Sequence, residues 1–477
     1  MVFNSAFFFV SLVAIYGAYL LLQSSWRVTK IVLVAYNFFF YGIWSVKFLI
    51  IMILTASVDY LVALAMQRYP QFKRVLLTLS IISGIGLLAY FKYLNFAIES
   101  ANTVAGLFGA TLDWPTRNII LPIGISFYTF HSLSYTIDVY RGKLKPITDY
   151  SDYLLFVSFF PCLVAGPIIR ATDFLRQIDT PRRPNGDDFL VGLSAVALGL
   201  FLKSVIADNI GPYVNSLFDH YQTNGIFENW LAATLFGTQI FADFAGYSGM
   251  AIGLARMFGF WIPRNFAAPY AAVGFSDFWR TWHISLSSWF RDYFYIPIGG
   301  NRVSALRQGF NLILTMFLCG LWHGATILFV IWGLLHGMLL AIEHGVRNAF
   351  VSLFPRAQPL GAAVAETSAF VTSMLLAQIG TYACVSAAWI AFRAKSLDQL
   401  IAMMKGLLSG PIKTGTVPSW LVLIAVGTIA CHMLQRRFDL TGRIERSRTL
   451  CGLTIAACFY LVVAIGAKGQ DFIYFQF

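Results

Sequence analysis

Long runs of apolar residues, separated by short polar loops, recur along almost all of this 477-residue chain. A helix that crosses a membrane needs about 20 consecutive apolar residues. Only 12% of the residues are charged, whereas soluble domains carry about 25%. The sequence therefore predicts an all-α polytopic membrane protein with about 11–13 transmembrane or re-entrant helices, which form one membrane domain over residues 1–477.

Three stretches depart from simple spans. The apolar runs 229–260 and 311–345 are too long for one upright span, so we expect long, tilted or broken helices there. The segment of about 261–302 interleaves aromatic and basic residues with proline and glycine. We expect it to form short helices and loops that lie in the interface or re-enter the bilayer, where protein or a cavity must cover the backbone.

The net charge of +12 indicates basic cytoplasmic loops rather than nucleic acid binding, because most lysines and arginines lie between apolar runs. Arg27 and Lys30 follow the first run, which places the N-terminus on the exoplasmic side. The arginine-rich segment 436–448 precedes the last run and places the C-terminus on the exoplasmic side as well. The first run has no basic segment before it and continues into a full span, so we expect no cleaved signal peptide.

His323 lies between two strongly apolar runs, within the segment Leu-Cys-Gly-Leu-Trp-His-Gly-Ala at 318–325. An ionisable residue at membrane depth is costly and usually faces a cavity, a partner or a substrate path. Burial lowers the pKa of an imidazole and keeps the ring neutral, and a neutral imidazole is a good general base near pH 7. The sequence therefore indicates that His323 is a catalytic base.

The six cysteines lie in or beside apolar segments without CxxC spacing, and we interpret them as small buried hydrophobic residues. We expect neither a disulfide nor a metal site. Cys319 precedes His323 by four residues and would share a helix face with it. Packing is one interpretation of Cys319, and a cysteine–histidine nucleophile pair is the other.

A second candidate is the segment 277–293, which we interpret as one helix. Its tryptophans would form an apolar stripe, while Arg280, His283 and Ser287 would share another face at spacings of three and four residues. An interfacial amphipathic helix, anchored by its aromatic residues, explains the stripe as well. An imidazole flanked by an arginine and a row of serines is nevertheless more typical of a lining than of an anchor.

Two further polar residues interrupt apolar runs. Asp243 either fixes the helix register through a buried polar pair, for which Tyr247 is the nearest partner, or orients a catalytic group as a supporting residue. His336 is either a second polar lining residue or a core imidazole whose hydrogen bonds are satisfied locally. The sequence leaves both alternatives open.

Together these residues resemble the membrane-bound O-acyltransferase (MBOAT) family, in particular the bacterial branch that O-acetylates alginate. The likeness rests on short motifs spread over most of the chain. They are LPIGISFYTF at 121–130, IDVYRG at 137–142, FFP at 159–161, AGPI at 165–168, FAGYS at 244–248, the aromatic segment 278–301 and WHG at 322–324. Family members usually carry serine in place of Ala245 and glutamine in place of His131, so we do not expect His131 to be catalytic.

The resemblance implies helices around a central tunnel, with His323 as the catalytic histidine, Trp322 as part of its motif and His283 as a second histidine that lines the tunnel. It also implies acetyl-CoA as a co-substrate, which approaches from the cytoplasm, and no permanently bound cofactor. The candidate contacts to the phosphates of CoA are three arginines, Arg280, Arg291 and Arg302.

The segment 472–477, FIYFQF, fits a Phe-x-Tyr-x-x-Phe pattern. It resembles the acyl-transfer motif of a small partner peptide in teichoic acid D-alanylation, whose tyrosine accepts the acyl group. The resemblance makes Tyr474 a candidate acyl acceptor. An aromatic anchor in the membrane interface is the other interpretation. The exoplasmic position expected for this segment favours the acceptor, because the acyl group must leave the membrane on that side.

The residues and the resemblance together predict an acetyltransferase in the inner membrane of a bacterium, surrounded by lipids. It would pass acetyl groups from acetyl-CoA to an extracytoplasmic, alginate-like polysaccharide, through Tyr474 or through a periplasmic acetyltransferase partner of the SGNH kind. Two alternatives stay open. The enzyme would transfer another acyl group, or transfer to a lipid; or, in a different class of function, the chain would transport a polysaccharide or a lipid-linked sugar.

Overall fold

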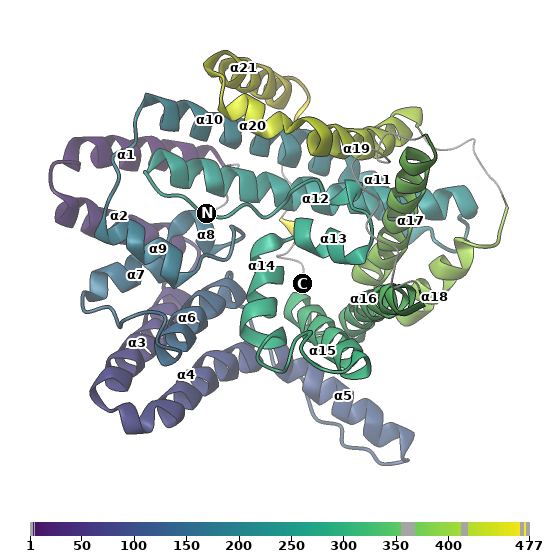
Figure 1. Cartoon of the computed structure of the whole chain (residues 1–477), viewed down its shortest axis with the longest axis horizontal. Coiled ribbons are helices and arrows are strands. Elements are labelled where there is room, and N and C mark those ends of the chain that lie inside the picture. The colour runs from purple at the N-terminus through teal and green to yellow at the C-terminus, as the bar shows by residue number, and fades with distance from the viewer. Residues whose placement is uncertain (1–2, 4, 354–367, 412–417, 468–471, 474–477) are drawn as a thin grey trace. The chain divides into compact units, whose positions relative to one another are not determined.

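The structure is a computed structural model, and it describes residues 3, 5–353, 368–411, 418–467 and 472–473. All regular elements within these ranges are helices, which confirms the predicted fold class (Figure 1). Contacts between residues divide the chain into two compact units, Met1–Leu200 with Tyr247–Pro263, and Phe201–Gly246 with Arg264–Phe477. The expectation of a single domain stays a prediction.

The helices of the first unit begin where short polar side chains cap them. The side chains of Ser5, Ser45 and Asp149 each accept a hydrogen bond from a backbone N–H of the first helical turn, which stabilises a helix start. The elements are α1 (Ala6–Leu22), α2 (Trp26–Gly42), α3 (Val46–Arg68), η1 (Pro70–Phe72), α4 (Lys73–Leu88), η2 (Ala89–Tyr93), α5 (Leu94–Leu107), α6 (Ile125–Tyr140), α7 (Tyr150–Ser158), α8 (Phe160–Leu163), α9 (Ala171–Asp179), α10 (Gly186–Leu200) and the last turns of α12.

A buried polar network joins four helices of this unit. The carboxylate of Asp59 in α3 accepts hydrogen bonds from Ser80 in α4, at 2.6 Å, and from Ser132 in α6. The hydroxyl of Ser132 also pairs with Tyr153 in α7 at 2.7 Å. Because hydrocarbon offers no water to these groups, they satisfy one another and fix how the helices pack.

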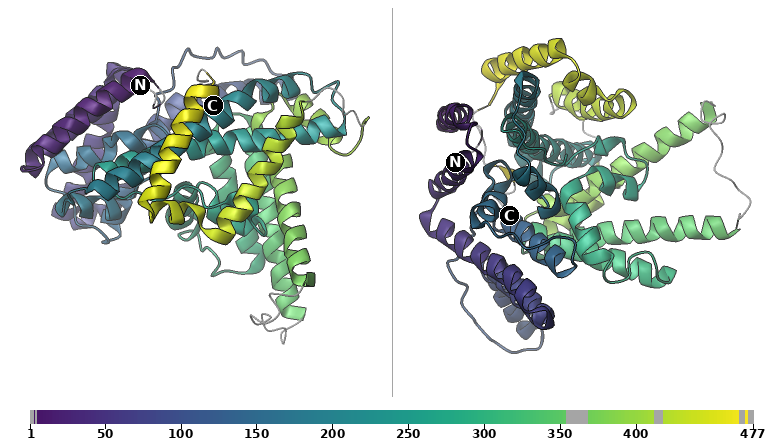
Figure 2. Two further views of the ribbon diagram at one scale, coloured as in Figure 1. Left: turned by 90° about the horizontal axis from the view of Figure 1, so that it is seen from above. Right: turned by 60° about the vertical axis from the view of Figure 1, so that its left-hand side comes forward.

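The second unit carries the remaining helices. They are η3 (Phe201–Ala207), α11 (Asp208–Asp219), most of α12 (Ile226–Met257), η4 (Pro269–Ala271), α13 (Phe275–Thr281), α14 (Ile284–Phe290), η5 (Arg291–Tyr295), α15 (Ala305–His323), α16 (Ile327–Leu353), α17 (Ser368–Arg393), α18 (Leu397–Gly406), α19 (Ser419–Phe438), α20 (Leu440–Glu445) and α21 (Arg448–Ile465). Figure 2 shows α16 and α17, in green, as a pair of long neighbouring helices.

The long apolar runs form the helices expected of them. Run 229–260 forms a single helix of 32 residues, α12, as far as Met257, whereas run 311–345 is broken at Gly324 into α15 and α16. Within the described residues, seven helical stretches are long and apolar enough to cross a membrane. They are Val46–Arg68, Pro70–Leu107, Gly186–Asp219, Ile327–Ala349, Ser373–Arg393, Ser419–Phe438 and Arg448–Ile465. The chain is therefore a multi-pass membrane protein.

Candidate active site

His283 lies at a sharp break between two short helices. α13 ends at Thr281 and α14 begins at Ile284, and His283 between them has a left-handed backbone, with φ 42° and ψ 54°. A non-glycine residue in this region stores about 1–3 kcal/mol of strain. The expectation of one continuous helix over 277–293 is therefore wrong, and Arg280, His283 and Ser287 do not share one helical face.

Asn265 holds this break in place from outside the two helices. Its carbonyl accepts a hydrogen bond from the backbone N–H of Ile284 at 2.9 Å, and its side-chain oxygen accepts one from the hydroxyl of Ser285 at 2.6 Å. Asn265 is 1% exposed. Asn265 thus accepts hydrogen bonds from the two residues that follow His283, and these bonds offset the cost of the backbone conformation of His283.

The imidazole of His283 is buried among aromatic rings. Its ring centroid lies 4.6 Å from that of Phe244 and 5.8 Å from that of Trp322, both edge-on. Within the described residues neither ring nitrogen has a hydrogen-bond partner. Burial lowers the pKa of His283 to about 3, so the ring is neutral at pH 7. A buried polar group without a partner is rare in proteins and commonly marks a functional position.

His323 is the last residue of α15, and its ring is enclosed by three aromatic side chains. The ring centroids of Trp322, Trp332 and Phe392 lie 4.9, 5.0 and 5.3 Å from that of His323. The residue is 3% exposed. Trp322 contacts both imidazoles, so the fold brings the two predicted histidines to one indole, although 39 residues of sequence separate them.

Glycines bring α16 against α15 at the level of His323. A Cβ atom on Gly320 would lie 2.3 Å from the carbonyl oxygen of Phe329 and 3.1 Å from Cα of Gly333. Only residues without a side chain allow two helix backbones to approach so closely. The contact seats Trp332 and Phe329 of α16 beside the end of α15.

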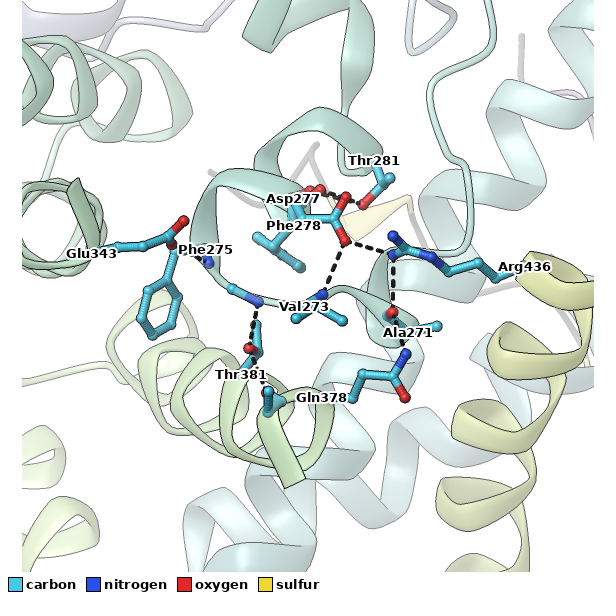
Figure 3. Close-up of polar contacts among 12 residues, drawn as sticks. Ala271, Val273, Phe275, Asp277, Phe278, Thr281, Glu343, Gln378, Thr381 and Arg436 are labelled. Atoms are coloured by element: carbon cyan, nitrogen blue, oxygen red, sulfur yellow. Dashed lines mark hydrogen bonds and ion pairs between the residues drawn. The ribbon is translucent and has the colours of Figure 1, made fainter. Parts of the chain in front are cut away.

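Three long helices fix the loop that leads into α13 (Figure 3). Arg436 of α19 donates to the carboxylate of Asp277 at 2.6 Å and to the carbonyl of Ala271 at 2.9 Å. Thr381 of α17 accepts from the N–H of Gly274 at 2.9 Å, and Glu343 of α16 accepts from the N–H of Ser276 at 3.0 Å. These bonds position α13, and through it the break at His283.

An open pocket of about 360 Å³ adjoins the wall of the His323 cage. Thr326–Phe329 line one side, and Phe392 with Ala394–Leu397 lines the other. Phe392 contacts His323 and also lines the pocket, and Phe329 packs on Phe392 with ring centroids 4.8 Å apart. These two rings therefore separate the pocket from the imidazole.

Asp243 lies in α12 and belongs to a buried cluster of charged residues. Its carboxylate pairs at 2.9 Å with the ammonium group of Lys203, which also pairs with Asp208 at 2.7 Å. All three side chains are at most 4% exposed. Buried ions are tolerated only when they are paired and hydrogen-bonded, so this cluster is a built feature of the membrane region.

The other predicted site residues are more dispersed. Arg280, Arg291 and Arg302 are all exposed, and Arg291 pairs with its neighbour Asp292 at 2.7 Å. Cys319 is buried in α15, one turn before His323. Tyr474 lies outside the described residues. The cysteine pair, the CoA contacts and the acyl acceptor therefore stay predictions.

His336 adds a third imidazole on the far side of Trp332. Its ring centroid lies 4.9 Å from that of Trp332 and 5.1 Å from that of Trp279. Within the described residues, neither its ring nitrogens nor the indole nitrogens of Trp279 and Trp332 have hydrogen-bond partners. His336 is fully buried and is not among the residues that line the pocket beside Phe392, so its role as a lining residue stays a prediction.

Sequence reasoning missed Lys203, Asn265 and the aromatic wall of Trp332 and Phe392. Lys203 carried a usable signal, because a lysine inside the apolar run 188–211 needs an acidic partner. Asn265 carried none, since its role depends on a contact made only in the folded chain. Within the described residues, no group of three His, Cys, Asp or Glu side chains is arranged to hold a metal ion.

The arrangement suits proton transfer during acyl transfer. It offers two imidazoles next to one indole in surroundings that exclude water, where a neutral base accepts a proton from a hydroxyl group efficiently. A pocket lies next to Phe392, which contacts His323.

Comparison with known proteins shows which family the chain belongs to. The family model for MBOAT, the membrane-bound O-acyltransferase family, matches residues 40–386, which include both histidines. A probable alginate O-acetylase of Azotobacter vinelandii is 38% identical over 415 residues, 86% of this chain and 78% of the relative. A peptidoglycan O-acetyltransferase of Helicobacter pylori is 33% identical over 444 residues, 87% of this chain and 78% of the relative. A teichoic acid D-alanyltransferase of Bacillus subtilis is 31% identical over 237 residues, 47% of this chain and 60% of the relative.

The family match spans most of the chain, and it coincides with the buried histidine pair derived from the fold. The resemblance expected from the motifs is confirmed. The chain belongs to the membrane-bound O-acyltransferase family and is an O-acyltransferase.

Proposed function

We propose that this enzyme passes acetyl groups from cytoplasmic acetyl-CoA to an extracytoplasmic polysaccharide in the inner membrane of a bacterium. The names of its relatives support the proposal. In all three names the acceptor is a polymer, namely alginate, peptidoglycan or teichoic acid, and in two of them the transferred group is acetyl. Which polymer this enzyme acetylates is not indicated by the residues of the site.

The observation that carries the proposal is the pair of buried imidazoles that both contact Trp322. The oxygen of an acceptor hydroxyl attacks the carbonyl carbon of the acetyl thioester, while its proton passes to the neutral ring of His323. The carbon–sulfur bond then breaks, and the proton moves from His323 to the sulfur of CoA. His283, whose ring nitrogens have no hydrogen-bond partner within the part of the chain that the structure describes, positions the thioester carbonyl or the hydroxyl.

The distribution of basic residues supports a donor on the cytoplasmic side. α19 ends in Arg436 and Arg437 and α21 begins at Arg448, so the positive-inside rule places this turn in the cytoplasm and Ile465 on the exoplasmic side. α15 begins between Arg302 and Arg307, and by the same rule these arginines favour a cytoplasmic start for α15 and a position of His323 toward the exoplasmic side. The exposed arginines, including Arg302, then meet the phosphates of CoA.

The pocket beside Phe392 supports an acceptor that arrives from the exoplasmic side. Thr326 directly precedes α16 and Lys395 follows the end of α17, and if α15 starts in the cytoplasm and α16 and α17 each cross the membrane, both residues belong to the exoplasmic side. The acceptor hydroxyl belongs either to Tyr474 or to a periplasmic SGNH-like acetyltransferase, which then acetylates the polymer. A phenolic ester on Tyr474 keeps enough transfer potential to pass the acetyl group on.

Two other functions are distinguished by the donor. A lipid acyltransferase, or an enzyme that transfers another acyl group, would prefer a donor other than acetyl-CoA, and the D-alanyltransferase relative makes this alternative concrete. A transporter would move polysaccharide without consuming any acyl donor.

The test is acetyl transfer by the purified enzyme in proteoliposomes, with a panel of donors from acetyl-CoA to palmitoyl-CoA. We expect turnover of acetyl-CoA, its loss in His323→Ala, and its retention in His220→Ala, which removes an exposed histidine. Normal turnover by a well-folded His323→Ala variant would contradict the proposed base. Consumption of palmitoyl-CoA alone, or of no donor, would favour the alternatives.

A further inference from the structure

The segment that follows α21 is tied at its start to an irregular part of the membrane helices. The backbone N–H of Ala467 donates to the carbonyl of Ser204 at 3.0 Å, and the side-chain amide of Asn209 donates to the carbonyl of Ile465 at 3.0 Å. Ser204 lies in the π-helix η3, where the regular pattern of helical hydrogen bonds is interrupted. Such π-helical turns occur frequently at functional positions.

The same segment is tied again six residues later, to Asp243. The backbone N–H of Ile473 donates to Oδ2 of Asp243 at 2.7 Å, a bond between residues 230 positions apart. Oδ1 of the same carboxylate faces the ammonium group of Lys203 at 2.9 Å. Lys203 belongs to the same π-helix as Ser204, so one irregular turn supports both attachment points.

The second attachment point lies beside the histidine pair. Phe472 is fully buried, and its ring lies 6.0 Å from that of Phe244, which in turn contacts His283 edge-on at 4.6 Å. Ile473 is 4% exposed. An aromatic anchor in the membrane interface would leave these side chains on the surface, whereas here they lie in the core of the second unit.

We propose that Asp243, oriented by Lys203, is the positioning residue that holds Phe472 and Ile473, the two residues that precede Tyr474 in the sequence, one aromatic ring away from His283. This inference rests on the proposed role of Tyr474 as acyl acceptor. In this proposal the buried ion pair of Asp243 and Lys203 has a function, which is to bind the backbone N–H of Ile473. That function explains why two charged side chains are kept at a position where apolar side chains would pack as well.

The anchor is tested by the accessibility of a single cysteine. Ile473→Cys, which keeps the backbone N–H, is introduced into a chain whose six native cysteines are replaced, and its labelling by a membrane-permeant maleimide is timed. Asp243→Ala should accelerate labelling at least about tenfold, because it removes a hydrogen bond to an ionised group. The matched control is Asp188→Ala, which removes an equally buried, ion-paired acid from the first unit and should leave the rate unchanged. Equal protection in Asp243→Ala would overturn the anchor.

A second pair of variants leaves the charged cluster intact and guards against misfolding of Asp243→Ala. Ile473→Pro removes the donor N–H, whereas Ile473→Ala removes only the apolar side chain. We expect Ile473→Pro to lower polymer acetylation at least about tenfold relative to Ile473→Ala. Equal acetylation by both variants, in a chain where Tyr474→Phe is inactive, would overturn the inference.

Failure of the proposed function has a different signature. If Tyr474→Phe acetylates the polymer normally, Tyr474 is not the acceptor, and maleimide labelling of the Ile473→Cys chain still decides whether Asp243 anchors the segment. If Tyr474→Phe is inactive while labelling is insensitive to Asp243, only the anchor is wrong.

Discussion

Adding one methyl group at Gly320 should separate α15 from α16 and disable the enzyme. The new Cβ atom would lie 2.3 Å from the carbonyl oxygen of Phe329 and 3.2 Å from the nitrogen of Gly333, both of them backbone atoms that no side-chain rotation can move. To restore an ordinary contact, the helices must shift by about 1 Å at this point, and overpacking of this kind costs about 1–3 kcal/mol. His323 lies one turn away on the same helix.

The shift should affect catalysis more than folding. A displacement of about 1 Å between reacting groups can reduce a rate about 100-fold, so we expect Gly320→Ala to lower acetyl transfer by that order while the protein still assembles in the membrane. Gly345→Ala in α16 is the control, because its Cβ atom meets nothing within 4 Å. Replacing a helical glycine by alanine at an open position stabilises by about 0.5–1 kcal/mol.

The assay compares initial rates of acetyl transfer and thermal unfolding of both variants in the same detergent. Near-normal activity and stability of Gly320→Ala would refute the argument that close backbone packing positions His323. A comparable loss of acetyl transfer in Gly345→Ala would show that an added methyl group disturbs the enzyme even where space is free. The short distances at Gly320 would then not explain the effect of Gly320→Ala.

Three further predictions concern individual residues. Asn265→Leu removes the side-chain oxygen that accepts from Ser285, which should release the strained backbone of His283 and lower the turnover of acetyl-CoA. Asn265→Asp keeps an acceptor oxygen and should stay closer to the normal turnover. Equal turnover in the two variants would contradict the role of Asn265 in holding the break at His283. Burial lowers the pKa of His283 to about 3 in the folded protein, whereas an unfolded histidine has a pKa near 6.5, so the unfolded state binds more protons below pH 6.5 and His283 should lower the free energy of unfolding by about 2 kcal/mol at pH 5 relative to pH 7. Denaturation at both pH values should therefore show a smaller loss of stability in His283→Gln, and an identical loss would contradict the burial argument. Cys319→Ala should keep most acetyl transfer, and its inactivation without misfolding would instead favour the cysteine–histidine pair.

The sequence was informative where a residue conflicts with its own surroundings. His323 and Asp243 interrupt apolar runs, and such residues are easily recognised in a sequence because ionisable side chains inside a bilayer are costly and usually functional. The helical fold class follows from the same apolar runs, since backbone groups in hydrocarbon must be satisfied within a helix.

Sequence reasoning failed where the outcome depends on distant contacts. Periodicity predicts one helix over 277–293, but the break at His283 is held by Asn265, about twenty residues earlier in the chain. The sequence indicated Tyr247, one turn away, as the nearest partner of Asp243, and it gave no sign of the contacts of Asp243 with Lys203 and with the N–H of Ile473. Neither contact has a local signature, because both arise from how the helices pack.

In the proposed reaction His323 is the general base that takes the proton of an acceptor hydroxyl while the acetyl group passes from acetyl-CoA to the oxygen of that hydroxyl. The most direct measurement is mass spectrometry of the purified enzyme after incubation with isotopically labelled acetyl-CoA, without a periplasmic partner or polymer. With Tyr474 as acceptor and His323 as base, we expect a labelled acetyl group on Tyr474 in the wild-type chain and none in a folded His323→Ala variant. Labelling of Tyr474 at the normal rate in His323→Ala would contradict the role of His323 as the base.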